Sequence, residues 1–122
     1  MTDNRDPGSL ADQAAEAIRA INHATASPKA EGGYVYPAEL YSVVMTLSHM
    51  ASMLPQLLKQ ASRWLEHQDE HDRLRVDNGN SMQCSIVVGG VLADLDDAVR
   101  LASMLNGVLE RAGQHLSRVG AK

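Results

Sequence analysis

Aromatic side chains are scarce in this chain of 122 residues, which has one tryptophan, three tyrosines and no phenylalanine. Its core must therefore be built from Leu, Val, Ile, Ala and Met, a mixture that suits helix-on-helix packing better than a sheet. An all-β fold is thus disfavoured. The length fits one domain with one core and is too short for a two-domain enzyme with a deep, closed active site.

Positive charge is also scarce: 11 Lys and Arg stand against 15 Asp and Glu, giving a formal net charge of −4. Proteins that bind a phosphate backbone neutralise it with many Lys and Arg contacts, so this balance disfavours nucleic acid as a partner. A DNA-associated accessory or regulatory protein stays an alternative. It would require basic residues to gather into patches across subunits, namely Arg19, Lys29, Arg73, Arg75, Arg111 and Arg118.

Long apolar runs and cysteine pairs are missing too. The longest apolar run is far shorter than the roughly 20 residues of a membrane helix. The first residues lack the basic start and apolar stretch of a secretory signal. Cys84 cannot form a disulfide within one chain, so we expect a cytoplasmic protein that makes no membrane contact.

Hydrophobic periodicity predicts an all-α protein with a short N-terminal helix at about 9–26. Ser9 followed by Asp12 resembles a capping pair at its start, and Pro28 stops it. We expect one helical domain at 9–118, with flexible ends at 1–8 and 119–122.

A second, long helix is predicted at about 37–74, with Pro37 in its first turn. Its apolar residues form a stripe roughly 160° wide. The phase of this stripe does not slip at Pro55, which favours a kink there over a change of direction.

A third helix at about 80–118 completes an antiparallel hairpin. The turn is expected at 77–80, where Asn and Gly tolerate left-handed backbone, and Asn80 with Gln83 can cap the helix. The pair Gly89-Gly90 is the weak point of this helix, because each glycine in a helix interior costs about 1 kcal/mol of stability relative to alanine.

The position of the turn fixes which residues of the two long helices face each other. It places Gly89 and Gly90 opposite Trp64 and Leu65, so that small residues receive the large ring. It also places residues of opposite charge near one another at the rim: Arg63 near Asp94, and Lys59 near Asp96 and Asp97.

Such a long, thin hairpin would leave a wide apolar surface exposed, because one short helix cannot cover both long ones. We therefore expect self-association into a bundle, most simply a dimer. The expected packing residues are Leu47, Leu54, Leu58, Trp64, Leu95, Val99 and Leu109, with a second contact or a core role for Tyr41, Met45 and Met53. The alternative is a monomeric five-helix globule, broken at Pro55 and at Gly89-Gly90.

Few residues suggest chemistry. His67 and His71 lie four apart in a His-x-x-Glu-His string and could hold a metal, although the pattern favours solvated histidines near the negative end of the helix over a metal site. No third ligand is evident near them in the predicted hairpin. Cys84 has no evident base, and no nucleophile elbow or phosphate-binding loop is present. We therefore expect neither catalysis nor a cofactor.

Two resemblances add to these expectations. The segments 36–41, 54–58 and 63–65 resemble small all-helical proteins of actinobacteria that are often associated with mobile or plasmid-derived elements. This resemblance implies a bacterial protein with an accessory role. In architecture, the acidic hairpin is similar to small type VII secretion substrates, whose Trp-x-Gly motif is missing here. The residues themselves favour a scaffold, adaptor or regulator that presents a helical surface to a protein partner.

Overall fold

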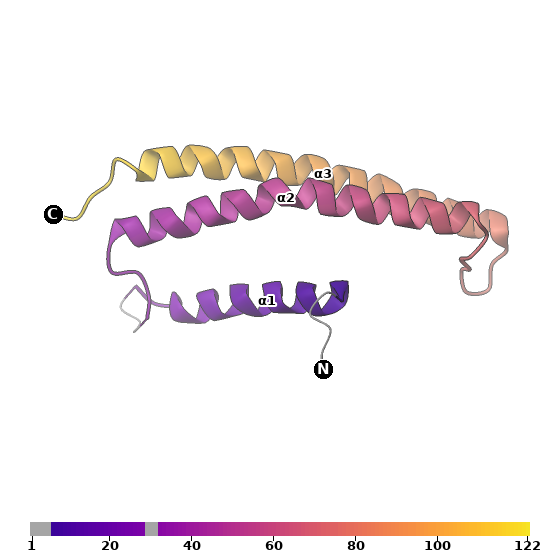
Figure 1. The fold of residues 1–122 in the computed structure, drawn as a ribbon, viewed down its shortest axis with the longest axis horizontal. Helices are drawn as coiled ribbons and strands as arrows, with labels where there is room; N and C mark the ends of the chain where they lie inside the picture. The colour runs from indigo at the N-terminus through magenta and orange to yellow at the C-terminus, as the bar shows by residue number, and fades with distance from the viewer. Residues whose placement is uncertain (1–5, 29–31) are drawn as a thin grey trace.

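The computed structural model describes residues 6–28 and 32–122, which form three helices and no strand. These are α1 (Pro7–Ala24), α2 (Pro37–Glu70) and α3 (Ser81–Leu116). Figure 1 shows α2 and α3 lying side by side along nearly their whole length, with α1 alongside the first half of α2. The predicted all-α hairpin with a short N-terminal helix is confirmed. Among the described residues, no helix has the length and apolar character needed to cross a membrane.

Helix α1 begins two residues before the predicted start because Asp6, and not Ser9, caps it. The Asp6 carboxylate accepts hydrogen bonds from the Ser9 amide at 3.2 Å and from the Ser9 hydroxyl at 3.0 Å. Pro7 then occupies the first turn, where its missing amide hydrogen costs nothing. The predicted Ser9 and Asp12 capping pair is therefore wrong.

Helix α2 continues unbroken through Pro55, with a gentle bend in its middle in Figure 1. It ends at Glu70, four residues before the predicted end. Asp72 adopts a φ of 53°, in the left-handed region that a right-handed helix cannot contain. Because α2 runs unbroken through Pro55, the alternative of a five-helix globule is wrong at its first proposed break.

Helix α3 begins at the predicted cap. The Asn80 side chain accepts from the Gln83 amide at 2.9 Å, and the Gln83 side chain accepts from the Asn80 amide at 2.7 Å. Asn78 in the preceding turn has a φ of 59°. Gly89-Gly90 lies inside an unbroken helix, so the second proposed break is also wrong.

The core lies between α2 and α3 and is made of small side chains. The buried residues there are Ser48 and Ala51 on α2, and Cys84, Val88, Ala102 and Gly113 on α3. The Met45 side chain packs against Gly113, whose lack of a Cβ leaves it room. Small residues allow two helix backbones to approach closely, and this accounts for the long, narrow shape of the hairpin.

Two polar pairs link the helices in the predicted register. Ser48 donates to the Asn106 side-chain oxygen at 2.7 Å, and Ser85 donates to the Asp69 carboxylate at 3.1 Å. Both pairs agree with the predicted facing residues to within about one residue, because the turn at Asn78 reverses the chain where expected.

Two predicted contacts across the hairpin are not formed. The Trp64 side chain is 61% exposed, and a Cβ built on Gly89 or Gly90 would meet nothing within 4 Å. The glycine pair therefore does not receive the ring. In the described part of the chain, neither Arg63 nor Lys59 forms an ion pair; Arg100, on the same helix as Asp96 and Asp97, binds both carboxylates.

Candidate interaction surface

Helix α2 carries two apolar stripes rather than one wide stripe. The stripe that follows the spacing of its buried residues is small or partly polar: Val44, Ser48, Ala51, Pro55, Leu58, Ser62 and Leu65. The second, here called the outer stripe, alternates steps of four and three residues along one helix face. It consists of Val43, Leu47, Met50, Leu54, Leu57, Ala61 and Trp64. Leu54, Leu57 and Trp64 of this stripe are exposed and thus not packed in the core.

Helix α1 covers only the first half of the outer stripe. Val43, Leu47 and Met50 are half-buried beneath it, whereas Leu57 is 58% exposed. None of the 18 residues of α1 is itself buried, and no Cα atom of α1 lies within 8 Å of α2 or α3. The first helix is thus set apart from the hairpin.

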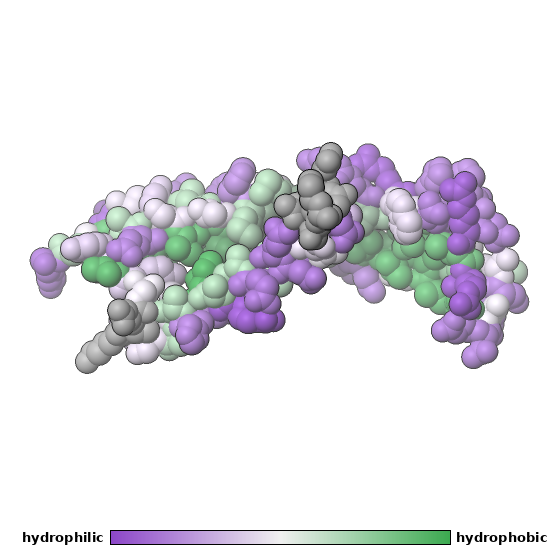
Figure 2. All heavy atoms as spheres, turned by 60° about the horizontal axis from the view of Figure 1, so that its bottom comes forward, coloured by the Kyte–Doolittle hydropathy of each residue, from purple (hydrophilic) through white to green (hydrophobic). Residues whose placement is uncertain are grey.

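An apolar groove, here called the α1–α2 groove, fills the space between these helices. Its volume is about 350 Å³. Its walls are Ala17, Ile18 and Ile21 of α1 and Ser42, Val43, Thr46, Leu47 and Met50 of α2. On the face shown in Figure 2, apolar side chains gather over this region and again toward the turn of the hairpin.

Helix α3 adds a further exposed apolar patch. Leu101 is 63% exposed and Met104 is 66% exposed, and Leu105 and Val108 are exposed beside them. Their spacing of three, one and three residues places all four on one side of the helix. The periodicity of the predicted third helix did not single out these four residues as a surface patch. The spacing alone was a signal that could have found it.

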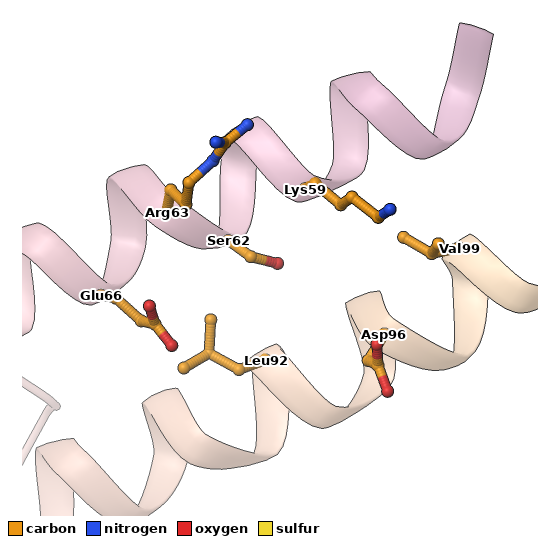
Figure 3. Close-up of a pocket in the computed structure, with 7 residues that line it drawn as sticks. All are labelled: Lys59, Ser62, Arg63, Glu66, Leu92, Asp96 and Val99. Carbon is orange, nitrogen blue, oxygen red and sulfur yellow. The ribbon is translucent and has the colours of Figure 1, made fainter.

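The other side of the hairpin is polar. A groove of about 470 Å³ runs between α2 and α3, with charged side chains at its rim and Leu92 and Val99 among its lining residues (Figure 3). Lys59, Ser62, Arg63 and Glu66 line it from α2, and Asp96 lines it from α3. Asp96 accepts from Arg100 at 2.6 Å. This hydrogen bond, with the charges of Asp96 and Asp97, raises the pKa of Arg100.

The structure divides the predicted packing residues into two sets. Leu58, Leu95 and Leu109 are half-buried and follow the spacing of the α2–α3 interface, and Tyr41 and Met45 are half-buried as well. Leu47 lines the α1–α2 groove, and Val99 lines the polar groove. Met53, Leu54 and Trp64 are exposed. The last set lies on the open surface, and Leu47 and Val99 line open grooves.

The two histidines of the possible metal site lie together at the end of α2. Their ring centroids are 4.2 Å apart, and the His71 Nδ1 atom lies 2.8 Å from the His67 carbonyl oxygen. Within residues 6–28 and 32–122, no group of three or more His, Cys, Asp or Glu could hold a metal ion. In the described part of the chain, the two imidazoles thus have no third candidate ligand beside them.

The basic residues of the DNA alternative are spread over the molecule. Arg73 and Arg75 lie in the connection between α2 and α3, whereas Arg111 and Arg118 lie near the opposite end of the hairpin. Arg19 pairs with Glu16 on α1, and Lys29 lies outside the described residues. The candidates that the structure describes thus form no single basic patch on one chain. In comparisons with known proteins, no protein-family model, curated protein or solved structure matches this chain.

Proposed function

We propose that this protein is a non-catalytic helical interaction protein that self-associates through the outer stripe of α2. The observation that carries the proposal is the placement of Leu54, Leu57 and Trp64, which are large, apolar and exposed on one line along the helix. Contiguous exposed apolar surface of this kind usually marks a site of protein association.

The total surface of the chain supports the proposal. Its accessible surface is 9584 Å². A folded monomer of 13.2 kDa is expected to expose about 6,400 Å². The excess, on the order of 3,000 Å², exceeds the roughly 800 Å² per partner that a standard interface buries. The elongated chain therefore leaves more surface uncovered than one standard interface would bury.

The polar groove would stay open in such an assembly, because it lies on the other side of the hairpin from the outer stripe. Its mixed charges, with Leu92 and Val99 between them, suit the polar and selective surface of a transient interface. We propose this groove as the surface offered to a different protein, in the role of a scaffold, adaptor or regulator.

Light scattering after size exclusion tests self-association, over a hundredfold range of concentration with and without EDTA. We expect a dimer or larger species that EDTA does not change. Leu57→Glu should yield a monomer, because it places a charge in the middle of the outer stripe. Gln56→Glu, at the neighbouring exposed residue, is the matched control and should associate like the wild type.

A wild-type monomer at every concentration would refute the proposal. Dissociation by EDTA would instead favour the metal-binding alternative at His67 and His71.

A further inference from the structure

The α1–α2 groove is a space that its two helices do not close by themselves. Helices in direct contact have axes about 8–10 Å apart, which brings Cα atoms on their facing sides within about 8 Å of one another. The structure describes both helices in full, and no Cα atom of α1 comes within 8 Å of α2. Ile18 and Ile21 line the groove and are each 37% exposed. The side chains of α1 and α2 therefore leave the space between the helices unfilled.

The size of the groove suits a small molecule. Its volume is about 350 Å³, which lies in the range of about 300–1,000 Å³ of small-molecule sites. A partner helix would require about 800 Å³ for each 10 Å of its length. An apolar cavity of about 150 Å³ is enough to bind benzene. The groove is a little over twice that size, which corresponds to a ligand of about two aromatic rings.

The lining of the groove sets the chemical class of this ligand. The eight described residues that line it are all uncharged, and most of them are aliphatic. A charged ligand would lose its hydration in the groove without gaining a partner of opposite charge. An uncharged and mostly apolar ligand gains from burial against both helices.

Two hydroxyl groups lie along one edge of the groove. Ser42 and Thr46 are four residues apart on α2 and therefore lie on the same side of that helix. Within the described part of the chain, neither hydroxyl makes a hydrogen bond to another group of the protein. Either oxygen can accept a hydrogen bond from an N–H or O–H group of a ligand in the groove.

We propose that the α1–α2 groove binds an uncharged, mostly apolar small molecule of about two aromatic rings, whose single N–H or O–H group donates to Ser42 or Thr46. This site does not depend on the proposed self-association, because Leu57 and Trp64 lie beyond the residues that line the groove. The ligand also gives α1 a role, because it fills the space between the helices and holds α1 to α2.

Binding of N-phenylnaphthylamine tests the proposal. This probe has a naphthalene and a phenyl ring, no charge and one N–H group, and it fluoresces when it is buried in an apolar site. Anilinonaphthalene sulfonate is the matched probe, because it has the same rings and N–H group with an added negative charge. Fluorescence titration gives both affinities, and calorimetry gives the number of molecules bound.

Two variants of α1 locate the bound probe. Ala17→Leu adds a side chain that occupies part of the groove, and Ala20→Leu adds the same side chain at an exposed residue outside it. Each is compared with the wild type and again in the Leu57→Glu background, in which the proposed self-association is removed. Circular dichroism checks that all variants keep their helices.

We expect the wild type to bind one N-phenylnaphthylamine per chain, and the sulfonate at least about tenfold more weakly. Ala17→Leu should weaken binding of the neutral probe at least about tenfold, and Ala20→Leu should bind it like the wild type. The same results are expected with Leu57→Glu. Ser42→Ala combined with Thr46→Val should weaken binding roughly fivefold, because it removes both acceptors.

Equal binding by Ala17→Leu and Ala20→Leu would overturn the proposal, because the probe would then lie elsewhere on the apolar surface. Absence of saturable binding to the wild type would also overturn it. Equal affinity for the two probes, or no effect of removing the hydroxyls, would refute the assigned class of ligand. Binding that disappears with Leu57→Glu would assign the probe to an interface between copies, which overturns this proposal and leaves self-association standing.

Discussion

Single residues set how closely α2 and α3 approach. Ala51, Ala102 and Gly113 are small enough for the backbones to come near, and Ser48 spans the gap with a hydrogen bond to Asn106. In the described residues, no large side chain is fully buried. The stability of the hairpin therefore depends on many small contacts, in which single polar pairs count for much.

The Ser48 hydrogen bond gives a first prediction. Ser48→Ala removes the donor to the partly buried Asn106 oxygen and should lower the free energy of unfolding by about 1 kcal/mol. Ser52→Ala is the control, because the exposed Ser52 hydroxyl bonds only to a carbonyl of its own helix. Urea denaturation at one fixed protein concentration measures both. An equal loss in the two variants would contradict the role assigned to the Asn106 contact.

The glycines of α3 give a second prediction. A Cβ at Gly89 meets open space, so Gly89→Ala should raise the free energy of unfolding by roughly 0.5–1 kcal/mol through helix propensity. At Gly113 the new methyl group would displace the Met45 side chain, so Gly113→Ala should gain less or lose stability. Thermal unfolding monitored by circular dichroism compares them. A larger gain at Gly113 than at Gly89 would disprove this description of the core.

At the scale of elements, short-range hydrogen bonds fix the helix ends. The capping box at Asn80 satisfies two backbone amides at the start of α3, and Asp6 does similar work for α1. These contacts span three residues and need no tertiary structure. This is why helix boundaries depend on a few particular side chains.

Removal of the α3 cap gives a third prediction. Asn80→Ala should lower the free energy of unfolding by about 1 kcal/mol, because it leaves the Gln83 amide without its acceptor. Ser81→Ala, one residue on, leaves both capping hydrogen bonds in place and should have little effect. Chemical denaturation distinguishes the two. A neutral Asn80→Ala would show that the helix start is held by other contacts.

Helix α1 is the element that we expect to gain most from the proposed self-association. An isolated helix of 18 residues is marginally stable in water, and α1 buries none of its residues in the single chain. We predict that its amides exchange hydrogen slowly in the wild-type dimer and rapidly in the Leu57→Glu monomer. Hydrogen exchange with mass spectrometry gives this comparison, with α3 as the internal reference. Equal protection of α1 in both would indicate that the chain alone stabilises it.

At the scale of the whole molecule, the proposed self-association would couple folding to protein concentration. A hairpin with so much exposed apolar surface gains stability when a second copy covers it, and the gain grows with concentration. The midpoint of thermal unfolding should therefore rise with protein concentration for the wild type and stay constant for Leu57→Glu. Scanning calorimetry over a hundredfold range measures this. A constant wild-type midpoint would argue against a dimer linked to folding.

The sequence by itself determined the three helices, the Asn80 and Gln83 cap, the turn at Asn78 and the facing residues of the hairpin. Each follows from local rules: helical periodicity, side-chain capping and the tolerance of Asn for left-handed backbone. Once the turn is placed, the antiparallel register follows from the chain itself. The predicted cap of the first helix was wrong, because the Asp6 side chain and not that of Ser9 caps α1.

Only the tertiary structure decided which side of α2 faces α3. An apolar stripe roughly 160° wide contains both the small residues around Ala51 and the large ones from Leu54 to Trp64, and periodicity cannot rank them. The choice depends on how closely two backbones approach, which is a property of both helices together. Because the small residues of α2 meet Ala102 and Gly113, Trp64 is left outside, and the candidate interaction surface follows from that choice.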